Sequence, residues 1–278
     1  MYKIGLSICG NIINEELFEK YARSGIFDME ISLRRAGYDD LNFDEVRRMA
    51  DKYGVRLWSL HLPFTGADHL DISKDEMADE TVAYHSELIK RASAVGIEKF
   101  IIHPSREPIA PEDRSHKMQT AKHSLSRLAR VASESGAVIA VEDLPRTCLG
   151  NCSDEILELI SVDPSLRVCF DTNHLLFEDP AKFVRNVGDK IVTLHVSDYD
   201  FVDEKHWLPG EGDINWSEIL QALRDVDYKG IWLYELEFES TKRITRERDL
   251  TCDDFYKNAM EIFSGKKPVP PCNYTKHV

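Results

Sequence analysis

The chain has 278 residues, of which 42% are hydrophobic, and this length suits a single large α/β domain. No apolar run approaches the roughly 20 residues that a membrane helix needs, and the N-terminus lacks a signal-peptide pattern. The formal net charge of −14 and the lack of a Lys/Arg cluster disfavour a nucleic-acid partner. The six cysteines are scattered, so we expect reduced thiols and a cytoplasmic location.

Eight short apolar segments along the chain predict β-strands, because β-branched and aromatic residues are concentrated in them. In chain order they are residues 2–8, 27–33, 56–64, 99–105, 137–145, 167–174, 191–199 and 230–238. Segments that are apolar on both faces and alternate with helices are typical of a parallel sheet.

The segments between these strands predict amphipathic helices, since their apolar residues recur every three or four positions. The clearest examples are residues 15–25, 43–54, 78–96, 121–136 and 217–228. Eight such strand and helix units favour closure, so we predict a single-domain (β/α)8 TIM barrel over residues 1–265. The Pro- and Lys-rich tail, residues 266–278, is expected to be irregular.

From the third predicted strand onward, each strand ends in a residue that is able to bind a metal ion. These residues are His61, His103, Glu142, Asp171, His195 and Glu235. Barrel enzymes build their sites at the C-terminal ends of the strands, so these side chains are expected to converge. Converging carboxylates repel one another and are costly to bury, and a divalent cation resolves both problems. Mixed carboxylate and imidazole ligands suit Mn, Mg, Co, Zn or Fe.

Each of these residues also has a structural interpretation. Glu142 could be a loop-edge acid paired with Lys or Arg, Asp171 a helix N-cap, and His195 a satisfied core histidine. For the last strand the choice lies between Glu235 and Glu237, and inward alternation favours Glu235.

Several motifs occur in a characteristic order on successive strands. They are Glu142 in VEDLPR, Asp171-x-x-His174, His195-x-x-Asp198, the segment H-x-x-P-G-E-G-D-I-x-W at 206–216, and a Glu in the last strand. This order resembles the xylose-isomerase-like barrel superfamily, over residues 1 to about 265. That superfamily includes sugar and sugar-phosphate isomerases and epimerases, inosose dehydratases, hydroxypyruvate isomerases and endonucleases of the endonuclease IV type.

The resemblance implies one divalent metal ion, Mn or Zn before Mg or Co, bound by Glu142, Asp171, His195 and Glu235. It also implies that Glu142 and Glu235 form an acid/base pair. The activity would be isomerisation or epimerisation of a small ketose, polyol or sugar phosphate, by proton transfer through a metal-stabilised cis-enediolate.

Further residues would contact the substrate on this view. They are His61, His103, Arg146, His174, His206 and Glu211. Arg146 could equally pair with Asp143 or Asp154, and His206 could be a surface histidine of its loop. Superfamily relatives are often dimers or tetramers, so a homo-oligomer is compatible with the resemblance.

Three other functions stay open. One is an inosose-type dehydratase, and another is a non-catalytic metal- or sugar-binding barrel, against which the presence of both Glu142 and Glu235 argues. The third is an endonuclease IV-like AP endonuclease with three zinc ions. The chain offers most of that ligand set, namely His61, His103, Glu142, Asp171, His174, His195, His206 and Glu235, with Glu204 where that branch has Asp. The net charge of −14 argues against this function, because binding several phosphates takes several cations.

Overall fold

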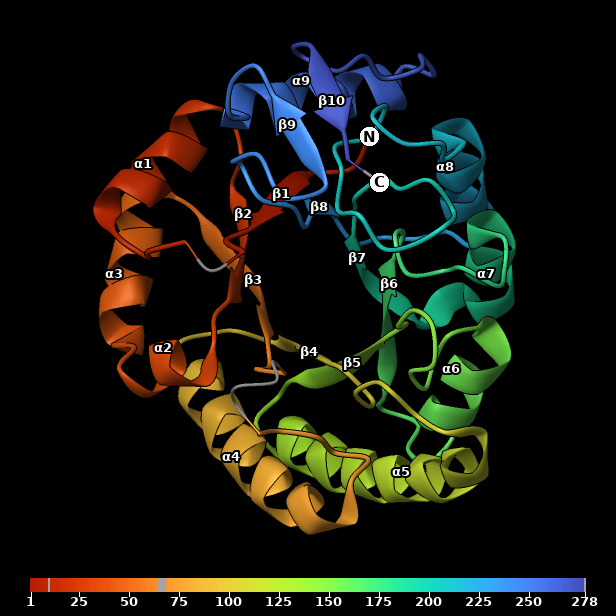
Figure 1. The fold of residues 1–278 in the computed structure, drawn as a ribbon. Coiled ribbons are helices and arrows are strands. Elements are labelled where there is room, and N and C mark those ends of the chain that lie inside the picture. Colours follow the sequence, from red (N-terminus) through yellow and green to blue (C-terminus); the bar gives the residue numbers. More distant parts are fainter. Residues whose placement is uncertain (10, 65–68, 278) are drawn as a thin grey trace.

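The computed structural model describes residues 1–9, 11–64 and 69–277, and it confirms the predicted barrel (Figure 1). Eight parallel strands form one sheet in the order β7-β6-β5-β4-β3-β2-β1-β8. The strands are β1 Ile4–Ser7, β2 Asp28–Ser32, β3 Arg56–His61, β4 Lys99–Ile102, β5 Val138–Glu142, β6 Arg167–Asp171, β7 Ile191–His195 and β8 Trp232–Tyr234. Each lies within one of the eight predicted segments.

The barrel closes between β7 and β8 through a short contact just beyond β7. Val196 forms a parallel bridge with Tyr234, its amide donates to Leu233 O at 2.8 Å, and its carbonyl accepts from Glu235 N at 3.2 Å. The closing contact therefore fixes the backbone of Glu235 next to that of His195.

The helices surround the sheet, as the sequence pattern predicts (Figure 1). They are α1 Glu15–Arg23, α2 Arg35–Asp39, α3 Phe43–Tyr53, α4 Asp75–Ser93, α5 Pro111–Glu134, α6 Ser153–Ile160, α7 Pro180–Val187, α8 Trp216–Asp225 and α9 Cys252–Phe263, with a 3-10 turn at Gly188–Lys190. The predicted segment 121–136 is the C-terminal part of α5, whose polar first turns begin at Pro111. No helix among the described residues is long and apolar enough to cross a membrane.

The interior of the barrel is filled below its mouth. One buried apolar group consists of Trp58, Ile231 and Leu233, and another of Ile101, Ala140 and Cys169. Side chains alternate between the two faces of a strand, so residues two positions beyond an interior residue also point inward. Leu233, Ala140 and Cys169 thereby place Glu235, Glu142 and Asp171 over this apolar floor.

Within the C-terminal tail, which is expected to be irregular over residues 266–278, residues 266–273 form no helix or strand, and three residues form a short strand. Strand β10 (Tyr274–Lys276) pairs antiparallel with β9 (Ile244–Arg246), with Thr275 opposite Thr245. Figure 1 shows this hairpin-like pair beside α9, near the mouth of the barrel. These three residues form a strand because β9 supplies their hydrogen-bond partners, which the local sequence does not reveal.

Candidate active site and metal centre

A cavity of about 720 Å³ opens at the C-terminal end of the barrel, a volume typical of small-molecule sites. Most of the predicted site residues line it. These are His61, His103, Glu142, His174, His206 and Glu235. Asp171 and His195 lie beneath them and are fully buried. The structure therefore brings these eight predicted side chains together at one end of the barrel.

Glu142, at the end of β5, is the centre of the cluster, and its side chain is 1% exposed. Its Oε2 lies 3.0 Å from His61 Nε2 and 3.1 Å from His103 Nε2, and its Oε1 lies 3.0 Å from His195 Nδ1. Burial alone would raise the pKa of Glu142, but His195 and His103 hold that pKa well below its usual value. Glu142 therefore has three imidazole neighbours, and they favour its ionised form.

Glu235 and Asp171 flank Glu142 in different environments. Glu235 Oε2 lies 3.0 Å from His195 Nδ1, and its side chain is 14% exposed to the cavity. Burial opposes ionisation of Glu235, yet His195 lowers its pKa to about 2. Burial raises the pKa of Asp171 to about 6, and Asp171 Oδ2 is buried without a hydrogen-bond partner.

Glu30 on β2 is a member of the cluster that the sequence analysis missed. It is fully buried, its Oε2 accepts from Ser59 Oγ at 2.7 Å, and the same oxygen lies 3.2 Å from His195 Nε2. One signal was available, because an acid in the middle of the apolar segment FDMEISL is costly unless it is paired. Glu30 orients the His195 ring, which leaves Nδ1 facing Glu142 and Glu235.

The donor set fits a divalent metal ion. Glu142, Asp171, His195 and Glu235 each offer one ligand atom, and these atoms lie within 4.8 Å of one another. Asp171, which belongs to this group, has a buried Oδ2 without a hydrogen-bond partner, as expected of a residue whose coordination a cation would complete. Carboxylates and imidazoles together suit Mn or Zn.

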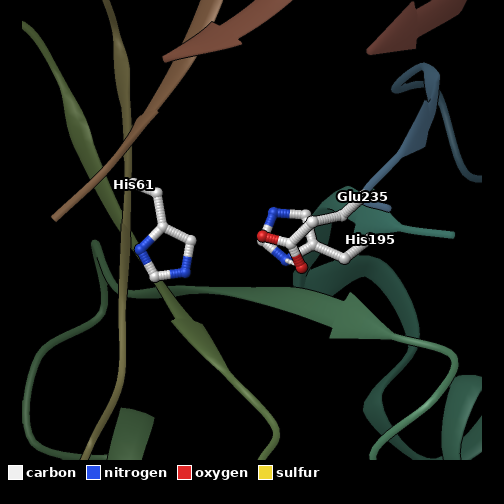
Figure 2. Close-up of side chains that lie close together, drawn as sticks. All are labelled: His61, His195 and Glu235. Carbon is white, nitrogen blue, oxygen red and sulfur yellow. Dashed lines mark ion pairs between the residues drawn. The ribbon is translucent and has the colours of Figure 1, made fainter. Parts of the chain in front are cut away.

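Two further groups of potential metal ligands overlap with this four-residue group. His61, His103 and Glu142 form one, and His61, His195 and Glu235 form the other, each with ligand atoms within 4.8 Å. In Figure 2, His61 lies on the opposite side of the interior from His195 and Glu235, and the three side chains approach the same space.

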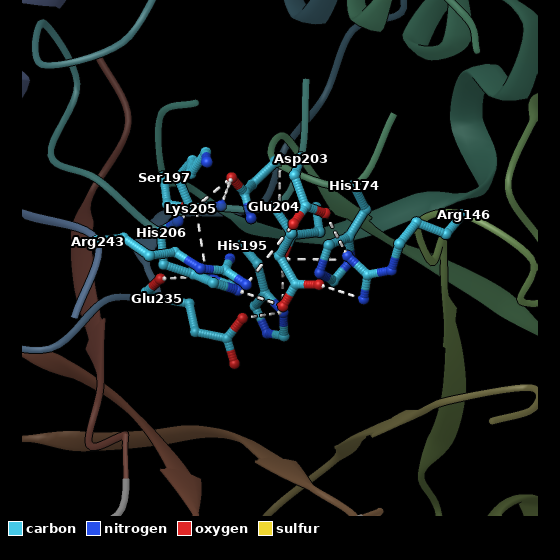
Figure 3. A network of polar contacts seen from close by, with 12 residues as sticks. Arg146, His174, His195, Ser197, Asp203, Glu204, Lys205, His206, Glu235 and Arg243 are labelled. Carbon is cyan, nitrogen blue, oxygen red and sulfur yellow. Dashed lines mark hydrogen bonds and ion pairs between the residues drawn. The ribbon is translucent and has the colours of Figure 1, made fainter. Parts of the chain in front are cut away.

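A separate group lies on the other side of the mouth and consists of His174, Glu204 and His206. His174 Nδ1 lies 2.8 Å from Asp143 O, and His206 Nε2 lies 3.2 Å from Glu204 Oε1. Burial would lower the pKa of His206, but Glu204 raises it to about 9. Figure 3 shows the network that holds this group.

Arg146, predicted to contact substrate, is engaged elsewhere. It does not line the cavity, because its guanidinium pairs with Glu107, Asp203 and Glu204. Neither predicted alternative partner, Asp143 or Asp154, is among these. Arg146 enters the network from the β5 side in Figure 3 and restrains Glu204, with Nη2 2.9 Å from Oε2.

Glu211 is also placed differently from its predicted role as a substrate contact. Its carboxylate is 1% exposed and accepts from Arg246 Nε and Nη2 of β9, both at 2.8 Å. The amide of Leu208 donates to Glu211 Oε2 at 2.8 Å. Glu211 is therefore a structural acid, which joins the 206–216 loop to β9.

Asp198, from the His195-x-x-Asp198 motif, organises the same loop. Its side chain accepts from the amides of Tyr199, Gly210 and Ile214, at 2.8 to 3.1 Å. At Gly212 an added Cβ would overlap the Asp198 carboxylate, so the loop can pass this close only with glycine there. The motif thus holds the backbone that carries His206.

The fold and this site together define a TIM barrel whose polar mouth is rich in potential metal ligands. The family model described as xylose isomerase-like TIM barrel matches residues 18–251. The chain therefore belongs to the xylose isomerase-like TIM barrel family, as the motifs predicted.

The relatives include proteins with and without a described activity. An uncharacterized protein of Methanocaldococcus jannaschii is 27% identical over 68% of this chain and 67% of its own length. The D-psicose 3-epimerase of Ruminiclostridium cellulolyticum is 26% identical over 76% of this chain and 74% of that enzyme. Among solved structures, a D-tagatose 3-epimerase-like protein has a TM-score of 0.80 at 22% identity, over 94% of this chain and 97% of that chain.

Proposed function

We propose that this protein is a metal-dependent isomerase or epimerase of a small ketose, polyol or sugar phosphate. The observation that carries the proposal is the pair Glu142 and Glu235, whose carboxylates lie 3.0 Å from the same His195 nitrogen and line one cavity. The relatives named as 3-epimerases of psicose support this reaction type.

The ligands of the metal ion would be Glu142, Asp171, His195 and Glu235. When bound, a divalent ion supplies a Lewis acid that polarises a carbonyl and its neighbouring hydroxyl and so acidifies the adjacent C–H bond. His61 and His103 restrain Glu142 through its Oε2, and Glu30 restrains His195.

Glu235 is the better placed of the two carboxylates to remove a proton. His195 lowers its pKa and so favours its ionised form, its side chain is part exposed to the cavity, and its Oε2 contacts His195. Glu142 is almost completely buried, and both of its oxygens face histidines. We assign proton removal from carbon to Glu235 and proton return to Glu142 or Glu235. An inosose-type dehydratase would use the same residues and lose water instead.

One observation favours a second candidate, an endonuclease IV-like AP endonuclease. The described residues contain a ligand group on each side of the four-residue group: His61, His103 and Glu142 on one side, and His174, Glu204 and His206 on the other. Such a mouth offers places for more than the one predicted ion, and multi-metal sites suit phosphodiester hydrolysis.

Solvent exchange and metal content together separate these functions. The isomerase or epimerase predicts deuterium incorporation from heavy water into a ketose carbon, with about one divalent ion per chain and no cleavage of abasic DNA. Three zinc ions per chain together with cleavage of abasic DNA would contradict the isomerase or epimerase and support the endonuclease. Loss of water from an inosose without exchange into ketoses would point to the dehydratase. Sugar binding without turnover would indicate a binding barrel.

A further inference from the structure

The rim of the mouth cavity carries basic side chains that the proposed proton transfer does not use. They are Arg34, Lys205, Lys242 and Arg243. They come from three segments, namely the turn between β2 and α2, the loop after β7, and the residues just before β9. Among the described lining residues outside the ligand groups, Glu237 is the only carboxylate.

Three of these four cations are available to a ligand. Arg34 and Lys242 are exposed and form no ion pair within the described part of the chain. Arg243 Nη2 lies 3.7 Å from Asp203 Oδ2, which is too long for a hydrogen bond. In Figure 3, Arg243 enters the mouth from the β9 side, opposite Arg146. Lys205 differs, because it is nearly buried and lies 3.5 Å from Asp200 Oδ2.

The net charge of the chain makes this arrangement informative. A protein with a formal charge of −14 repels small anions, so an anionic substrate needs a local positive field at its site. Lys and Arg form short, charge-assisted hydrogen bonds with phosphate, and the Arg guanidinium matches two phosphate oxygens at once. A neutral sugar has no group that uses three such cations.

We propose that the substrate is a phosphorylated sugar whose phosphate is bound by Arg34, Lys242 and Arg243. This inference rests on the proposed function, because it names the substrate class of the same cavity. The carboxylates Glu142 and Glu235 lie on the cavity floor and the three cations at its entrance. The sugar therefore enters with its carbonyl end first, and its phosphate stays at the rim.

The test compares D-psicose with D-psicose 6-phosphate as substrates for deuterium exchange by the metal-loaded protein. The phosphorylated sugar is expected to have a kcat/KM at least about tenfold higher, mainly through a lower KM, since each charged hydrogen bond contributes about tenfold in affinity. Lys242→Met and Arg243→Gln are each expected to lower the ratio of the two kcat/KM values about tenfold. Equal values for the two sugars in the wild-type protein would overturn the proposal.

Lys229→Met is the matched control. Lys229 is an exposed lysine that precedes β8 at the opposite end of the barrel, and among the residues that the structure describes it pairs with Asp227 alone. Lys229→Met changes the net charge by the same amount as Lys242→Met and is expected to leave the ratio of the two kcat/KM values unchanged. Lys242→Arg keeps the positive charge and is expected to retain the wild-type ratio.

The failure of the proposed function is recognised separately. Absence of exchange with either sugar would contradict the isomerase, and calorimetric titration of both compounds then decides the phosphate site on its own. The phosphate site is supported if D-psicose 6-phosphate binds more tightly than D-psicose and if this binding is weaker in Lys242→Met. Equal binding of both compounds, or binding of neither, overturns it.

Discussion

Two groups of buried acids in this barrel are equally hidden from solvent but are compensated very differently. Glu211 is 1% exposed and meets a full complement of donors, namely Nε and Nη2 of Arg246 and the amide of Leu208. At the mouth, Glu142 and Asp171 are buried as deeply, but their neighbours are imidazoles and other carboxylates. Asp171 Oδ2 has no hydrogen-bond partner at all.

The difference shows what each group does. A buried carboxylate with a bidentate Arg is complete without a ligand and stabilises a loop. A group of buried carboxylates whose positive neighbours are imidazoles alone is incomplete where an oxygen such as Asp171 Oδ2 accepts no hydrogen bond, and a divalent cation offsets the repulsion and desolvation there. We therefore interpret Glu211 and Arg246 as structural and the mouth as a place for a cation.

The largest effect is expected for Glu235→Gln. It retains the size of the side chain but removes the base, so exchange into the ketose should fall by about 10³-fold while the fold is retained. Glu239→Gln, four residues along, exposed and outside the cavity lining, is the matched control and should change exchange less than about twofold. Wild-type rates in Glu235→Gln would contradict the assignment of Glu235 as the base. They would also mean that the acids at the mouth do not differ in function from the structural acid Glu211.

A stability effect of about 3–5 kcal/mol is expected for Arg246→Met, because it leaves the Glu211 carboxylate buried and unpaired. The free energy of unfolding, measured in urea, checks this value. The double variant Arg246→Met with Glu211→Met should recover most of the loss, since it buries no charge. A single variant as stable as the wild type would show that the pair is dispensable.

Removing a buried charge at the mouth is expected to stabilise the metal-free protein, whereas Arg246→Met destabilises it. In metal-free protein, Asp171→Asn should raise the free energy of unfolding by about 1–3 kcal/mol, because burial disfavours the charge of Asp171 and its Oδ2 accepts no hydrogen bond. Added Mn²⁺ or Zn²⁺ should stabilise the wild type, by about 2.7 kcal/mol at a hundredfold excess over Kd, and the variant much less, as measured by thermal unfolding. Destabilisation of the metal-free variant would show that Asp171 is satisfied by the protein alone.

His85 represents a third way of burying a polar group and has the smallest expected effect. Burial lowers the pKa of His85 to about 4, although the Pro63 carbonyl lies 3.2 Å from Nε2. The unfolded chain binds a proton near pH 6.5 and the folded chain only near 4, so stability is full above pH 6.5 and falls between these values.

The stability lost through His85 as the pH falls from 6.5 to 4 is at most about 3 kcal/mol for this pKa difference. His85→Leu should remove this part of the pH dependence, as measured by urea unfolding at several pH values. An identical slope in the variant would place the titration in other groups.

The sequence determined the barrel and the location of its site. Apolar periodicity is a local property, so the eight strands and their order along the chain were predictable from it. The C-terminal ends of parallel strands meet at one end of a barrel, and this rule is enough to predict that Glu142, Asp171, His195 and Glu235 lie together.

Only the tertiary structure decided which charges meet. The pairing of Glu30 with His195, of Glu211 with Arg246, and of β10 with β9 joins segments far apart in the chain. Arg146 was predicted in the cavity and lies instead among Glu107, Asp203 and Glu204. The physical reason is that burial and long-range contacts determine which partner a charged side chain has. Neither can be inferred from the residues next to it in the sequence.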